Sequence, residues 1–159
     1  MLKKIVIAGA LTAVAACGPT PVAGCNPIPP ALKCVHAGQP GDHTYHPDRL
    51  RFIRCATVTG VIVAVRSEAD GDNHVLMRLD RPFSNMINPV NVTRQKGALV
   101  LEPECQHAVT QADAKSACPK NLPPVVFVIG ARYSVTGAYV TDLDHGWNEI
   151  HPLTSARRI

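Results

Sequence analysis

The chain has 159 residues, a formal net charge of +4 at pH 7 and only 4% aromatic residues. Setting aside an N-terminal targeting segment with its two lysines lowers the charge from +4 to +2. This weak bias excludes the basic stripe that nucleic-acid-binding proteins carry, and the few aromatic residues offer no stacking platform for single-stranded bases. Six cysteines without a C-x-x-C pair predict disulfides in an exported protein rather than a zinc or thioredoxin-type site.

Residues 1–16 have the pattern of a bacterial signal peptide. A lysine pair precedes the uncharged, mostly apolar run Ile5–Ala16, which is shorter than the roughly 20 residues needed to span a bilayer. The letters VAAC, ending at Cys17, resemble the lipobox of bacterial lipoproteins, which implies lipidation of Cys17. Gly18, the residue directly after the lipidated cysteine, then implies that the protein is anchored in an outer membrane and faces the periplasm. Cleavage after Ala15 is the alternative, and it would give a secreted or periplasmic soluble protein.

Residues 17–50 are rich in proline and glycine and lack hydrophobic periodicity. Such a stretch cannot bury enough surface to form a core, so it predicts a disordered tether between membrane and domain. One folded domain is then expected at 51–159, which is near the common size of a small domain.

The cysteine spacing predicts two local disulfides, Cys25–Cys34 and Cys105–Cys118, although sequence alone leaves the connectivity open. If Cys17 carries a lipid, five cysteines remain and one has no partner. Cys55 is the candidate for that unpaired thiol.

Five strand signals, separated by turns, dominate the domain and predict an all-β fold with a short helix. The strands are expected at Cys55–Arg66, His74–Asp80, Gly97–Glu102, Val125–Val140 and Trp147–Leu153.

The connections point to a particular architecture. The first strand has Gly60 where a sharp bend is expected, and Pro152 restricts the last strand to an edge or its end. Residues 80–95 are expected as a long loop, and a short helix is expected at 107–116 within a cysteine-flanked excursion over 103–123. A long bent first strand with an insert between the third and fourth strands predicts an OB-fold-like five-stranded barrel. A small β-sandwich is the alternative.

Two short segments concentrate carboxylates and imidazoles. In the first, 70–74, an extended backbone would place alternate residues on one face, although Asp-Gly is also ordinary turn chemistry. In the second, 142–152, Trp147 would share a strand face with an acid and an imidazole, for which a solvated strand face is the plain alternative. Mixed carboxylate and imidazole sets suit Zn, Mn, Fe or Ni. The candidate groups are Asp70, Asp72, His74, Asp144, His145, Glu149 and His151.

Two resemblances bear on these segments. The motifs DGDNH at 70–74 and HGWNEIHP at 145–152 resemble a family of small exported bacterial proteins of uncharacterised function, which implies the domain boundary but no activity. The strand VAVR followed by DGD also resembles the first hairpin of thermonuclease-type OB-fold enzymes. That resemblance implies Asp72 and Asp70 as Ca²⁺ ligands, but Asn73 stands where that family has threonine.

Together these patterns predict a lipid-anchored envelope protein that binds a divalent metal ion or a polar ligand through an Asp/His/Glu face, and they give no strong evidence for a nucleic-acid partner. The alternative is a metal-dependent hydrolase of the phosphodiesterase or nuclease kind, with Glu149 as general base. A purely structural envelope protein is the third hypothesis. The expected metal ligands are Asp70, Asp72, His74, Glu149 and His151, and the expected ligand-binding residues are Trp147, His145 and Asp144.

Overall fold

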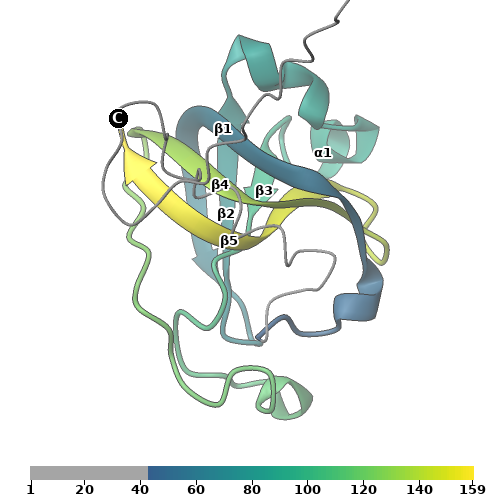
Figure 1. Cartoon of the computed structure of the whole chain (residues 1–159), viewed down its shortest axis with the longest axis vertical. Coiled ribbons are helices and arrows are strands. Elements are labelled where there is room, and N and C mark those ends of the chain that lie inside the picture. The colour runs from purple at the N-terminus through teal and green to yellow at the C-terminus, as the bar shows by residue number, and fades with distance from the viewer. Residues whose placement is uncertain (1–42) are drawn as a thin grey trace, which may run out of the picture.

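Five strands pair in the order β1-β2-β3-β5-β4, and the sheet closes on itself into a barrel (Figure 1). The structure is a computed structural model that describes residues 43–159. The predicted all-β fold with five strands and short helical elements is confirmed. The strands are β1 (Leu50–Ser67), β2 (Asn73–Leu79), β3 (Leu99–Leu101), β4 (Arg132–Asp142) and β5 (Asn148–Arg158). The helical elements are η2 (Pro47–Arg49), η3 (Arg81–Met86), α1 (Pro89–Arg94) and η4 (Ala112–Ala114).

Ordered structure starts before residue 51, because the last part of the expected tether, 43–50, packs against the barrel. There the Thr44 hydroxyl donates a hydrogen bond to Glu104, and β1 already begins at Leu50. No helix within 43–159 is long and apolar enough to cross a membrane. The predictions that lie outside the described residues are the signal peptide at 1–16, lipidation at Cys17, the Cys25–Cys34 disulfide and the rest of the tether.

β1 closes the barrel because it is long enough to pair with two strands. Its first part pairs with β4 and its second part with β2, and Gly60 takes part in both pairings. A side chain at Gly60 would collide with the carbonyl oxygen of Arg78 in β2. Gly60, where a bend was expected, therefore lies where β1 passes from one neighbour to the other.

The wall formed by β2, β3 and β5 determines where polar side chains go. Alternate residues of these strands point into the barrel, so the residues between them point outward. The outward side chains His74, Glu149 and His151 are nevertheless buried, since other parts of the chain cover this wall. The inward residues belong to the main core: Val75, Met77, Leu99, Leu101 and Ile150.

The loop expected at 80–95 contains two helical elements, so that prediction was wrong. η3 fills its first part, and α1 begins at Pro89 after a complete capping box. The Asn88 side chain accepts hydrogen bonds from the N–H groups of Val90 and Asn91, which satisfies donors that a helix N-terminus leaves free. The Asn-Pro pair was the sequence signal for this helix start.

The helix expected at 107–116 is reduced to the three-residue turn η4. The reason is that backbone N–H groups of the 103–123 excursion donate hydrogen bonds to the β1–β2 turn instead of to carbonyl groups within a helix. Gln106 and His107 donate their N–H groups to Gly71, and Thr110 donates to Ala69. The excursion projects from one end of the barrel (Figure 1) and carries the predicted Cys105–Cys118 disulfide. Among the described cysteines, Cys55 has no disulfide partner, in line with its predicted free thiol.

The last two strands differ from their predicted limits. β4 starts at Arg132, so the first apolar run of the expected 125–140 strand is not a strand. β5 runs to Arg158. Pro152 was expected at an edge or at the end of the strand, but it lies inside β5, at a bulge that the sequence did not predict. The pairing with β4 passes from Ile150 to Leu153 at that point, so the missing N–H of Pro152 breaks no ladder bond.

We expect Gly71→Ala to destabilise the protein by about 3 kcal/mol, because two costs combine. Gly71 has a φ of 103°, and a Cβ there would lie 2.9 Å from Val109 of the excursion. Gly130→Ala is the matched control, since Gly130 has a φ of 84° and no described atom within 4 Å of a Cβ, and it should cost about 1 kcal/mol. Urea unfolding of both variants measures the difference, and equal losses would contradict the close approach of the excursion.

Candidate functional site

Three neighbouring strands bring acidic and histidine side chains to the same wall. Each contributes two groups at alternate positions: Asp72 and His74 from the start of β2, a second pair just after β3, and a third pair in β5. Parallel pairing of Val100 with Glu149 sets β3 beside β5 in the register that makes these pairs meet. We call this set the acid–imidazole cluster; its members are Asp72, His74, Glu102, Glu104, Glu149 and His151.

His151 lies at the centre of the cluster and uses only one of its two ring nitrogens. Nδ1 is 2.9 Å from Glu102 and 3.1 Å from Glu149. Nε2 has no hydrogen-bond partner among the described residues, although the side chain is 8% exposed. It lies 3.9 Å from Asp72 Oδ2 and 3.7 Å from Glu104 Oε1. A buried polar atom without a partner is costly, so this nitrogen is the cluster atom whose hydrogen-bonding capacity the described residues leave unused.

Glu102 connects the two imidazoles of the cluster. One of its oxygens pairs with His151, and the other is 3.2 Å from Nδ1 of His74. Glu68 lies 3.5 Å from the same Nδ1, while the other ring nitrogen of His74 bonds to Gln95 at 3.1 Å. His74 therefore has a partner on each nitrogen, which distinguishes it from His151.

Trp147 covers Glu149 and forms the edge of a cavity. Its indole N–H donates to Glu149 Oε2 at 2.8 Å, so both oxygens of Glu149 are engaged by Trp147 and His151. The His145 ring stacks on Trp147 with centroids 4.4 Å apart and an interplanar angle of 5°. Asp142 holds His145 in place through an ion pair of 2.6 Å to Nδ1.

A cavity of about 310 Å³ opens above the cluster. It brings together the β1–β2 turn and the β4–β5 turn, which were the two segments singled out in the sequence. Glu102 and His151 are the cluster members that reach it, and Trp147 and His145 also line it. Its other acidic, basic and histidine lining residues are Arg49, Arg66, Glu68, Asp70, Asp142, Asp144 and His46.

Burial and mutual charge decide the protonation of the cluster. Burial raises the pKa of Asp72 to about 7, although the Cys105 N–H that it accepts opposes this. Burial and then the charge of Glu102 raise the pKa of Glu149 to about 7. Burial alone would lower the pKa of His151, but Glu102 and Glu149 raise it well above its usual value. His151 in turn outweighs burial at Glu102 and holds the pKa of that carboxyl well below its usual range.

The cluster has more acid than its imidazoles can balance. Four carboxyl groups face two imidazoles, so two negative charges would remain if every carboxyl were ionised and both imidazoles were protonated. Extra protons, a cation or both must compensate a buried excess of this kind, because an unpaired buried charge is strongly unfavourable. Within residues 43–159, three combinations of side chains place a ligand atom each within 4.8 Å of one another: Asp72 with Glu102 and His151, Glu68 with His74 and Glu102, and Asp72 with Cys105 and Cys118.

The structure divides the residues that the sequence singled out. Asp72, His74, Glu149 and His151 are buried together, so the plain alternative of a solvated strand face is wrong for Glu149 and His151. Asp70 stays at the cavity, where it accepts the N–H of Asp72. Asp144 pairs with Arg49 at 3.0 Å, also at the cavity.

The sequence interpretation missed the acids that complete the cluster. Glu102 and Glu104 come directly after the buried strand β3, so their i, i+2 spacing continues its alternation. That spacing was the available signal for both. Gln95 and Glu68 had no such signal, because they reach His74 from a helix end and a turn.

No protein-family model, curated protein or solved structure matches the chain. The resemblances to an exported bacterial family and to thermonuclease-type hairpins therefore remain predictions. The interpretation of the cluster depends on its own geometry and chemistry.

We expect the metal-free protein to lose stability as the pH rises from about 5 to 8. A carboxyl whose pKa is raised on folding destabilises the fold once the pH exceeds its unfolded value, and the full penalty is present above about 7 for Asp72 and Glu149. The raised pKa of His151 acts in the same direction, since its contribution is lost as the pH rises through the folded value. The melting temperature of the chelator-treated chain should fall by ~5 °C or more over this window.

Glu149→Gln should make this decline shallower, because it removes one of the titrating carboxyls. Asp48→Asn is the control, since Asp48 is exposed and outside the cluster, and it should leave the slope unchanged. A melting temperature that stays level or increases between these pH values would contradict the protonation pattern.

Proposed function

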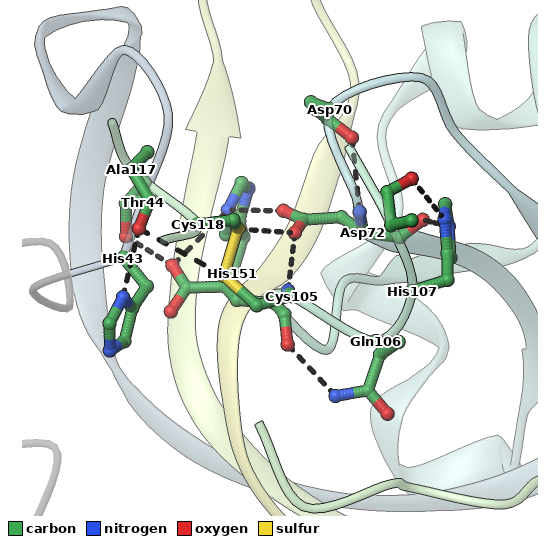
Figure 2. Close-up of a disulfide and its surroundings, with 12 residues drawn as sticks. His43, Thr44, Asp70, Asp72, Cys105, Gln106, His107, Ala117, Cys118 and His151 are labelled. Carbon is green, nitrogen blue, oxygen red and sulfur yellow. Dashed lines mark hydrogen bonds and ion pairs between the residues drawn. A yellow bond between two sulfur atoms is a disulfide. The ribbon is translucent and has the colours of Figure 1, made fainter. Parts of the chain in front are cut away.

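We propose that the protein is an exported, lipid-anchored envelope protein whose barrel binds a divalent cation. His151 Nε2, Asp72 and Glu104 supply the ligand atoms. The observation that carries this proposal is the unpartnered, buried Nε2 of His151, which faces two carboxylate oxygens at 3.7 and 3.9 Å. Metal–ligand bonds of about 2.0–2.3 Å place two neighbouring ligand atoms of one ion at separations comparable with these two distances. Figure 2 shows Asp72 and His151 directed toward one another.

The other side of the imidazole supports the same proposal. A histidine that binds a metal through one nitrogen generally donates the N–H of the other nitrogen to a carboxylate, which orients the ring. Glu102 and Glu149 both accept from Nδ1 of His151. With the Nδ1 proton directed at these carboxylates, Nε2 is the nitrogen that would bind a cation once it gives up its own proton. Cation binding would replace protons held by His151 and Asp72, so it should release protons to the solvent.

The strand order supports an OB-fold-like barrel as the scaffold. A five-stranded closed sheet with β1 shared by β2 and β4 and with β3 beside β5 is the arrangement expected for that fold. The envelope location rests on the sequence pattern of residues 1–17. The cavity of about 310 Å³ beside the cluster gives a polar ligand access to Glu102 and His151.

The chemistry of Glu149 favours binding over hydrolysis. A general base must reach the proton that it removes, directly or through one water. Both oxygens of Glu149 are engaged within the protein, its side chain is 1% exposed, and it does not line the cavity. Its position instead suits the orientation of His151, so we retain a binding role for the site.

Isothermal titration calorimetry of the chelator-treated full chain with Mn²⁺, Zn²⁺ and Ca²⁺ tests the proposal. At least one of these cations should bind with one-to-one stoichiometry and release protons. His151→Gln should weaken this binding by more than the roughly 10–100-fold typical for loss of a supporting partner, because it removes a ligand atom.

His46→Gln is the matched control, because His46 lies at the cavity but outside the cluster, and it should bind like the parent. Circular dichroism verifies that each variant is folded. Absence of binding of all three cations to the parent, or equal affinity in His151→Gln, would overturn the proposal.

A further inference from the structure

The disulfide lies against the proposed cation site. Cys105 donates its backbone N–H to Asp72 Oδ1 at 2.7 Å, and Cys118 Sγ lies 3.9 Å from the same oxygen. Both cysteines are buried, and Figure 2 shows the sulfur–sulfur bond beside Asp72 and His151. Asp72 thus faces the Cys118 sulfur and the Cys105 N–H through Oδ1, and the unpartnered Nε2 of His151 through Oδ2.

We propose that reduction of the Cys105–Cys118 disulfide creates a zinc site held by the two thiolates, Asp72 and His151 Nε2. Asp72 and both sulfurs already lie within 4.8 Å of one another. Cys118 Sγ lies 3.9 Å from Asp72 Oδ1, and His151 Nε2 lies 3.9 Å from Asp72 Oδ2, so the disulfide and the imidazole adjoin the two oxygens of one carboxylate. Small side-chain rotations would bring the four side chains to one ion with Zn–S bonds of about 2.3 Å and Zn–N bonds of about 2.0 Å. The Cα atoms of Cys105 and Cys118 are 5.4 Å apart, so after reduction rotation of the two side chains can separate the sulfurs.

The redox step balances with a dithiol as the co-reactant. The dithiol gives two electrons to the disulfide and becomes a disulfide itself, and the two protein sulfurs take up its two protons. Binding of Zn²⁺ then displaces these protons from the thiols to the solvent, because the thiolate is the form that binds metal.

Reduction would therefore change which cations the site prefers. In the oxidised protein the proposed site offers oxygen and nitrogen atoms alone, whereas the reduced protein adds two soft thiolates that favour zinc and cobalt. The inference rests on the proposed function in that it uses the same His151 nitrogen and the same Asp72 carboxylate. It goes further by assigning a ligand role to the disulfide sulfurs.

Cobalt absorption spectroscopy tests this inference, because Co²⁺ stands in for Zn²⁺ and shows a near-ultraviolet charge-transfer band when bound to thiolates. The full chain is used with serine at Cys17, Cys25, Cys34 and Cys55, so that the two cysteines of the disulfide are the remaining thiols. The band should appear at one Co²⁺ per chain after reduction by a dithiol and should be absent before it. Competition with Zn²⁺ should show affinity roughly 100-fold or more tighter in the reduced chain than in the oxidised chain.

Three variants of this two-cysteine chain serve as comparisons. Replacing Cys105 and Cys118 by serine should abolish the band, while Asp72→Asn and His151→Gln should keep thiolate absorption but weaken Co²⁺ binding at least about 10-fold. Equal Co²⁺ affinity in these last two variants would show that the thiolates act alone and would overturn the four-ligand site.

Circular dichroism on the same samples decides the remaining cases. Absence of the band in a reduced chain that stays folded would overturn the inference, as would reductive unfolding that Co²⁺ does not reverse. Calorimetry of the oxidised chain tests the proposed function separately, since the thiolates are not available there. A failure in the oxidised state alone counts against the cation site of the oxidised protein, and a failure in the reduced state alone counts against the zinc site.

Discussion

The contact of Glu102 with two imidazoles is the interaction on which the buried wall depends. Its two oxygens pair with His74 and His151, which belong to the strands on either side of β3. Because desolvation of a charged carboxylate is costly, Glu102 can remain ionised here only through these partners. The three strands must therefore keep their register, since a slip of one residue would move the imidazoles to the opposite face and leave Glu102 without a partner.

The cover over this wall comes from segments distant in the sequence. Trp147 closes the side of Glu149, Thr44 binds Glu104, and the excursion that carries Cys105 binds Asp72. The disulfide holds the two ends of that excursion together, while Gly71 allows its backbone to approach the β1–β2 turn. The barrel provides the rigid wall, and these segments convert an outward-facing polar surface into a buried one. Burial then gives the cluster its unusual protonation, because water no longer stabilises the charged carboxyls.

Binding and catalysis would use the same residues in different ways. A cation held by His151 Nε2 would satisfy its unpartnered nitrogen and compensate the excess of carboxylates at once. A hydrolase would additionally need a base that meets a substrate in the cavity. Of the cluster members that reach the cavity, Glu102 is engaged by both imidazoles, and the unpartnered nitrogen of His151 faces Asp72 and Glu104. In the proposed reduced form, the sulfurs beside Asp72 would extend the same ligand set from hard to soft donors.

The sequence by itself indicated five strands and a local disulfide between Cys105 and Cys118, because alternation, turn chemistry and cysteine spacing are local signals. It also singled out Asp72, His74, Glu149 and His151. The tertiary structure decided that these groups are buried together, since their meeting depends on the register of β2, β3 and β5 and on a covering excursion. The sequence did not single out Glu102 and Glu104, because an acidic residue after a short strand carries no specific signal. They gain an imidazole partner in β5 only because β3 pairs with β5 in parallel. The helix expected at 107–116 failed for the same reason, because its backbone donors found partners in a distant turn.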